Sequence, residues 1–354
     1  MRLAFGLLVV AAPLMAQTPL AARIAQAPDG VVRMQFDARP GVCGDGRDRI
    51  SFRHSTFGDH FESYGRWSDD SCLAGPLRVT LSVAGNRVTR VQTQVGGRWN
   101  TTGDRVTDLG IVSPREASAY FFSLVARSDA LRDRNYTLLP AVLADDVVVI
   151  SPLLGIARDD SRTMDTRRQA VHFLGMFGDA SVIPALVSFA NEDDRRDAAG
   201  LAGSAIAALS QLESGAGIPA LIELARKGPQ GTRKNAVFWL GQCGDPRALR
   251  TLRTIISDGD ENIEVRKNAI FSLGQSEETP TRDLALLYGD LGDRALKEQA
   301  IFALSQRNDN AATDALIRIA RDDRDKSMRG KAIFWLGQKH DPRATKLISD
   351  LILK

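Results

Sequence analysis

KNAVFWLGQ at residues 234–242 and KAIFWLGQ at residues 331–338 are nearly the same stretch, written twice in one chain. Each copy has Ala four places before its Leu, Val or Ile three places before it, and Gly or Ser directly after it. Repetition at a fixed interval of this size indicates a stacked array, in which each unit is one supersecondary element. Aligned on that leucine, the stretch recurs every 31 to 35 residues, at Leu174, Leu209, Leu240, Leu273, Leu304 and Leu336.

A second apolar segment follows each copy. GDPRA at 244–248 and HDPRA at 340–344 stand between the two segments, where Asp245 and Asp341 can cap a helix that has proline in its first turn. Further upstream, Ser113 and Glu116 form a possible capping box at the start of the helical region. We therefore expect helical hairpins over residues 113–354, in about six to seven repeats. In four repeats, the second helix has a leucine twelve residues after the leucine of the repeated stretch: Leu186, Leu221, Leu252 and Leu316.

The A-[VI]-x-x-L-[GS] core and the DPRA turn resemble HEAT repeats, most closely the short bacterial type. The resemblance covers about two-thirds of the chain. It implies a mostly α fold, an α-solenoid of HEAT-like helical hairpins preceded by a small β domain. Such repeats serve mainly as binding scaffolds, so the resemblance implies a binding surface rather than a particular reaction.

Residues 17–112 have the alternation of β-strands. LRVTLSVA and RVTRVQTQV, joined by Gly85-Asn86, predict a hairpin, and short strands are expected near residues 31–38, 49–53 and 104–112. We expect a small antiparallel β domain, cross-linked by a disulfide between Cys43 and Cys72. Closing that loop would stabilise the domain by about 3 kcal/mol. Cys243 is left over and is expected to be a buried, unreactive thiol.

The first residues predict export. MRLAFGLLVVAAPLMAQ has one basic residue and then an apolar run shorter than the roughly 18 residues that span a bilayer. It fits a signal peptide of residues 1–16, cleaved after Ala16, which predicts a periplasmic or secreted protein without membrane insertion after cleavage. The net charge of +3 gives no electrostatic case for nucleic acid as a partner.

One position in the repeated stretch departs from an ordinary amphipathic helix. At 100° per residue, Ala236, Val237, Trp239 and Leu240 share one broad face, which predicts the core. Phe238 falls on the other side, among polar residues. In a stacked array such positions align into stripes, which predicts a protein- or peptide-binding stripe of Asn235, Phe238, Gln242, Asn268, Phe271, Gln275, Phe302, Gln306, Phe334 and Gln338.

Two interpretations of this stripe stay open. The phenylalanines could cover the seams between repeats, since burying one is worth roughly 1.5–3 kcal/mol. Alternatively they could line a groove, where the amides would bind the backbone of an extended peptide. An accompanying column of Arg233, Arg266 and Arg329 is expected to be a structural ladder that pairs with Asp at the repeat turns.

Catalytic chemistry has little support in the sequence. His54, Asp59, His60 and Glu62 lie close together, but their spacing matches no zinc motif. We expect no catalytic residues, no metal and no cofactor. The leading hypothesis is an exported, monomeric, non-catalytic scaffold. The alternatives are an enzyme or enzyme subunit of the HEAT type that handles tetrapyrroles, and a structural spacer of the cell envelope.

Overall fold

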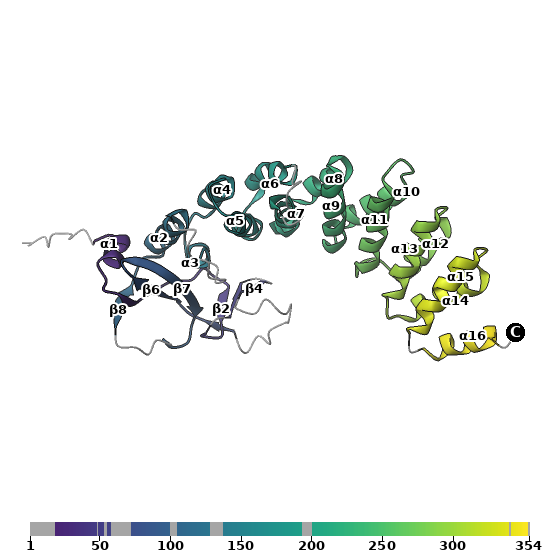
Figure 1. The fold of residues 1–354 in the computed structure, drawn as a ribbon, viewed down its shortest axis with the longest axis horizontal. Coiled ribbons are helices and arrows are strands. Elements are labelled where there is room, and N and C mark those ends of the chain that lie inside the picture. Colours follow the sequence, from purple (N-terminus) through teal and green to yellow (C-terminus); the bar gives the residue numbers. More distant parts are fainter. Residues whose placement is uncertain are drawn as a thin grey trace, which may run out of the picture. The chain divides into compact units, whose positions relative to one another are not determined.

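The computed structural model describes residues 18–47, 49–52, 55–57, 72–99, 105–127, 137–192, 200–339 and 341–352. The chain forms two compact units, Met1–Val149 and Ile150–Lys354 (Figure 1). The helix predicted after Ser113 is present as α2 (Pro114–Arg127), but an earlier helix, α1 (Leu20–Ala25), lies within the expected β domain and was not predicted. The first unit nevertheless continues to Val149, because α2 packs against α1 (Leu20–Ala25) and α3 (Leu139–Leu143). The predicted signal peptide and the His54–Glu62 cluster lie outside the described residues.

The larger sheet of the first unit has the strand order β7-β6-β1-β8. The predicted hairpin is present. At its turn, Gly85 and Asn86 both have positive φ (56° and 59°), as a type I′ turn requires. β8 is a correction: it pairs parallel to β1, so the sheet is mixed rather than wholly antiparallel. β8 lies at the edge opposite β7, so the chain passes from one edge of the sheet to the other between these two strands. The strands are β1 (Gly30–Phe36), β6 (Leu77–Ala84), β7 (Arg87–Val95) and β8 (Val106–Ile111).

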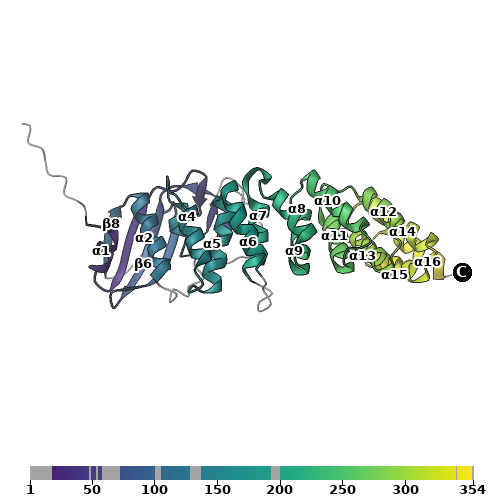
Figure 2. The same cartoon turned by 90° about the horizontal axis from the view of Figure 1, so that it is seen from above.

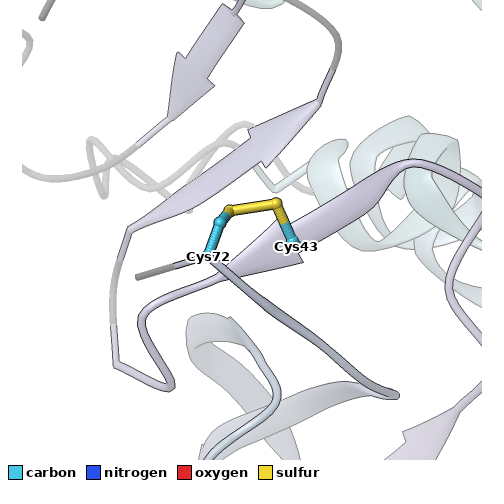
Figure 3. The surroundings of a disulfide bond; sticks show 2 residues. All are labelled: Cys43 and Cys72. Carbon is cyan, nitrogen blue, oxygen red and sulfur yellow. A yellow bond between two sulfur atoms is a disulfide. The ribbon is translucent and has the colours of Figure 1, made fainter. Parts of the chain in front are cut away.

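The smaller sheet is held by a disulfide. Its order is β4-β3-β2-β5, and every pair is antiparallel. Cys43 on β2 is bonded to Cys72, which directly precedes β5, with their Cα atoms 5.3 Å apart (Figure 3). The predicted pairing is therefore present in the structure. The strands are β2 (Val42–Gly44), β3 (Ile50–Phe52), β4 (Ser55–Phe57) and β5 (Leu73–Ala74).

Helices cover one face of the larger sheet. Phe121 of α2 lies against Phe36 of β1, with ring centroids 6.4 Å apart, and both are fully buried. Ser113 caps α2, since its Oγ accepts a hydrogen bond from the Glu116 N–H at 3.1 Å. The Glu116 carboxylate accepts from the Leu20 N–H at 2.5 Å, so it ties α1 to α2 rather than closing a reciprocal capping box.

The second unit consists of helical hairpins in two rows (Figure 2). Helices within each hairpin pack on each other, and each helix with the repeated stretch packs on its equivalent in the next hairpin. Row A holds the helices with the repeated stretch: α5 (Met164–Phe177), α7 (Leu201–Gln211), α9 (Gln230–Gln242), α11 (Ile263–Gln275), α13 (Arg294–Ser305) and α15 (Lys326–Gly337). Row B holds the others: α4 (Ile150–Arg158), α6 (Ile183–Ala190), α8 (Ile218–Lys227), α10 (Pro246–Ser257), α12 (Thr281–Asp290), α14 (Asn310–Asp322) and α16 (Pro342–Ile352). Two short 3₁₀ turns, Ala180–Val182 and Glu213–Gly215, stand before α6 and α8.

The repeated stretch forms the core between the rows, as predicted. Ala236, Val237 and Leu240 have no exposed surface, and Leu252 of the following helix is equally buried. Asp245 caps α10, because its carboxylate accepts the Arg247 N–H at 2.6 Å. Asp341 accepts the Arg343 N–H at 2.9 Å and begins α16 in the same way.

Glycines after the leucine bring row-A helices together. A Cβ built on Gly241 would lie 2.6 Å from Ser272 Cβ of α11, and one built on Gly274 would lie 2.7 Å from Ala303 Cβ of α13. Only a residue without a side chain fits at such distances. These glycines therefore set close seams at α9/α11 and α11/α13. Among the described residues, no helix has the length and apolarity to cross a membrane.

Candidate partner-binding groove

The predicted phenylalanine stripe lies on row A, on the side away from the core. Its two end members are open to solvent, since Phe238 is 39% and Phe334 is 58% exposed. The two middle members, Phe271 and Phe302, are half-buried. The stripe thus combines the two interpretations left open by the sequence: the middle rings cover a seam, and the ends are accessible.

Four rings form a continuous aromatic strip across α11, α13 and α15. Phe271 stacks on Phe302, with ring centroids 6.2 Å apart and an interplanar angle of 14°. Phe302 also contacts Trp335, at 5.4 Å. Trp335 in turn contacts Phe334 edge-on, at 5.2 Å and 78°. We call Phe271, Phe302, Trp335 and Phe334 the aromatic strip. Phe238 pairs instead with Trp239 of its own helix, at 5.5 Å.

The sequence assigned Trp239 to the core, and this was wrong. Trp335 and its counterpart Trp239 are half-buried at the surface of row A. On the helical wheel they lie at the edge of the core face, so their direction alone does not decide whether they are covered. A signal was present in the sequence: the place before the leucine holds Ala or Ser in three repeats, but tryptophan in two. The position is buried where it holds Phe173, Ala208, Ser272 or Ala303, so this variation indicates a different environment in the two tryptophan repeats alone.

The predicted amides flank the aromatic residues. Asn268 is half-buried, whereas the others are exposed, and Gln306 Nε2 donates to Ser305 Oγ at 3.1 Å. Amide groups both donate and accept hydrogen bonds, which suits the backbone of an extended chain. The exposed members are Asn235, Gln242, Gln275, Gln306 and Gln338.

Two hollows lie on either side of Trp335. The larger, the α13/α15 groove, has a volume of about 660 Å³ and is lined by Phe302, Trp335 and Phe334, with Gly330 among its walls. The smaller, of about 410 Å³, lies where α13 and α15 end and includes Gln306 and Gln338. Volumes of this size suit a large side chain or a small ligand. Two predicted phenylalanines and two predicted glutamines therefore meet at one pair of helices.

Charged side chains rim the α13/α15 groove. Lys331 of α15 pairs with Glu298 of α13 at 3.0 Å, and Lys267 of α11 pairs with Glu264 at 3.0 Å. All four are partly exposed, and such surface pairs contribute at most about 1 kcal/mol. Their lysines can therefore exchange these partners for a carboxylate from another molecule. The sequence did not single out Lys267, Glu298 and Lys331, because charged residues are common on the surface of any helix.

The arginine column is structural, but its partners differ from those expected. Arg233 donates to the Gly228 carbonyl at 2.9 Å, Arg266 to the Ile256 carbonyl at 2.9 Å, and Arg329 to the Asp323 carbonyl at 2.7 Å. Each acceptor lies at the end of the preceding row-B helix. Carbonyls there lack intrahelical donors and carry partial negative charge, so they bind the guanidinium groups. Arg233 also pairs with a carboxylate, that of Glu261, at 3.1 Å.

No described side chain points to catalysis. Among the described residues, no group of three or more His, Cys, Asp and Glu side chains could hold a metal. Cys243 is half-buried rather than buried, its Sγ donates to the Trp239 carbonyl at 3.1 Å, and burial raises the pKa of the thiol to about 11. Its thiolate is therefore scarce at neutral pH. Burial also lowers the pKa of His172, which holds the phenylalanine position in α5.

Solved structures similar to this chain include a lyase complex, a hydroxylase and a designed repeat protein. The complex of CpcE and CpcF of phycocyanin lyase from Nostoc sp. PCC7120 is 22% identical, covering 44% of this chain and 99% of its own, with a TM-score of 0.34. Human deoxyhypusine hydroxylase is 19% identical over 62% of this chain and 79% of its own, with a TM-score of 0.29. A designed armadillo repeat protein in complex with the peptide (KR)4 is 12% identical over 54% of this chain and 99% of its own, with a TM-score of 0.29.

A family model agrees with the helical rows. No curated protein matches the chain. The model for HEAT repeats matches residues 218–305 and again residues 260–336. These ranges begin at α8 and end within α15, so they include the aromatic strip and the close seams. Residues 218–336 of this chain are HEAT repeats.

Proposed function

We propose that the protein is an exported, non-catalytic scaffold that binds an extended segment of a protein partner along row A. The observation that carries the proposal is the exposure of Phe334, at 58%, beside a groove that the aromatic strip lines. A phenylalanine needed only for stability would be covered, because burial stabilises the fold by roughly 1.5–3 kcal/mol. Exposed aromatic surface with amides around it is typical of an interaction site.

A double substitution tests binding along row A. Phe238→Ala with Phe334→Ala removes the two exposed rings, so we expect nearly unchanged melting and loss of the partner from pull-downs of envelope extract. The matched control is Leu286→Ala, which removes another exposed apolar side chain, 68% exposed, from row B. A partner captured equally well by all three proteins would contradict the proposal. So would a large loss of stability in the double variant.

Export is the second part of the proposal, and it rests on the apolar run of the first residues. Expression of the full chain in a Gram-negative host should give a periplasmic product that begins at Gln17. Mass spectrometry of the intact protein measures this directly. A cytoplasmic product that retains Met1 or Arg2 would contradict export. The absence of catalysis remains a prediction.

A further inference from the structure

The seam between α13 and α15 is built differently from the two seams before it. At the close seams, Gly241 faces Ser272 and Gly274 faces Ala303. In the next repeat, Ser305 takes the place of the glycine and Trp335 takes the place of the small residue. An indole cannot occupy the space of a methyl group in a packed interface. Trp335 therefore acts as a wedge, and the α13/α15 groove opens beside it.

The groove offers an aromatic wall to one large apolar side chain, and its other lining residues are mostly polar, among them Glu298, Gln299 and Ser327. Its aromatic walls are Phe302, Trp335 and Phe334. Gly330 leaves one side open, because a Cβ built there would meet no atom within 4 Å. Anchor residues of interfaces bury themselves in pockets of this kind, and aromatic anchors contribute most.

The charge of row A indicates what surrounds that side chain. Helices α9, α11, α13 and α15 hold nine Lys and Arg residues and only two Asp and Glu residues. Arg233, Arg266 and Arg329 bind carbonyls, and Lys297 lies 3.7 Å from Asp323. Arg294 pairs with Asp325 at 3.2 Å. The remaining four cations are Lys234, Lys267, Lys326 and Lys331, and two of them pair with the glutamates of these helices, Glu264 and Glu298. Positive surface with few partners favours an acidic ligand.

We propose that the α13/α15 groove binds an acidic, extended peptide segment that inserts one large apolar side chain beside Trp335. This rests on the proposed function and specifies the chemistry of the partner. Packed helices lie about 8–10 Å apart, and an extended chain in the polyproline II conformation advances about 3.1 Å per residue and points every third side chain the same way. Every third residue of the segment therefore faces a new helix. Carboxylates three residues from the anchor reach the lysines that rim the groove, Lys267 on α11 and Lys331 on α15.

A designed peptide tests the proposal with the intact protein. The probe is a fluorescein-labelled Gly-Ser peptide with a central Phe and a Glu at the third residue to either side. We expect binding by fluorescence anisotropy that weakens as salt is raised. Replacing the Phe by Ala, or both Glu by Lys, should weaken binding about tenfold or more.

A pair of protein variants locates the site. Gly330→Leu fills the groove, so it should weaken binding of the Glu-Phe peptide about tenfold or more. Gly155→Leu is the matched control, because Gly155 is also an exposed helical glycine with no atom within 4 Å of an added Cβ, and it lies in α4. We expect it to bind like wild type. Melting curves of both variants show that each is folded.

Three results would overturn the proposal: no binding by wild type, equal binding of the Lys-Phe peptide, or binding unaffected by Gly330→Leu. None of these results contradicts the broader proposal, which fails if the partner is still captured after the loss of Phe238 and Phe334, or if that loss greatly lowers stability. A peptide that fails beside a partner that depends on those rings would mean that row A binds a segment of different chemistry.

Discussion

The seams at α9/α11 and α13/α15 use the same pair of positions in opposite ways. At α9/α11, a glycine faces a serine, and the helices lie so close that a side chain in place of the glycine would clash with the serine. At α13/α15, a serine stands opposite a tryptophan, and a groove of about 660 Å³ lies beside it. The array therefore has close packing at one seam and an accessible surface at another, although both seams join hairpins of the same kind.

The difference shows how a repeat protein can acquire a specific site. The buried Ala236 and Leu240 of α9 match Ala300 and Leu304 of α13. The buried Ala269 and Leu273 of α11 likewise match Ala332 and Leu336 of α15, so the core does not distinguish the two seams. The distinction comes from two positions at the edge of the core. Because neighbouring repeats interact mainly with each other, such a change alters one seam and leaves the rest of the array intact.

The largest expected effect comes from adding the same side chain at both seams. Gly241→Val forces the new atoms against Ser272 Cβ and its carbonyl oxygen, 2.6 and 2.8 Å from an added Cβ, so we expect a loss of about 3 kcal/mol in the free energy of unfolding. Ser305→Val, at the equivalent place, should cost less than about 1 kcal/mol. Urea unfolding followed by circular dichroism measures both. Equal losses would show that the two seams are packed alike.

Removing the wedge should give the next largest effect. Trp335→Ala deletes a half-buried ring that contacts Phe302 and Phe334, and we expect a loss of about 2 kcal/mol. Adding Ser305→Gly recreates the glycine-alanine pair of the close seam. If the helices then approach, the double variant should recover about 1 kcal/mol, measured as a double-mutant cycle in urea. Strict additivity of the two changes would mean that Trp335 does not hold the helices apart.

The sequence was sufficient to predict the helical hairpins. Buried residues such as Ala236 and Leu240 follow the period of a helix, and six copies repeat the pattern, so periodicity identifies the row that packs inward. Asp245 and Pro246 likewise mark the start of α10, because capping depends on neighbouring residues only. The Cys43–Cys72 disulfide was accessible from sequence because two cysteines flank a short segment.

The candidate site was only partly predictable. A helical wheel gives the direction of Phe238 and Phe334 but not the distance to the next helix, which is set by residues about thirty positions away. That distance decides that Phe271 and Phe302 are half-buried and that Trp335 lines a groove. The parallel pairing of β8 with β1 escaped for a similar reason, since strand order depends on contacts far apart in the sequence.

The smallest expected effects are two changes in the free energy of unfolding that have opposite signs. Gly330→Ala places its methyl group in open space within α15, so it should raise the free energy of unfolding by about 0.5–1 kcal/mol, because alanine restricts the unfolded chain. Gly274→Ala makes the same change in α11, but its Cβ would lie 2.7 Å from Ala303 Cβ, so the close seam must separate and stability should fall. Thermal unfolding of the two variants beside wild type gives the comparison. A stabilised Gly274→Ala variant would show that the close seam yields without cost, and a destabilised Gly330→Ala variant would show that α15 is packed as tightly as α11.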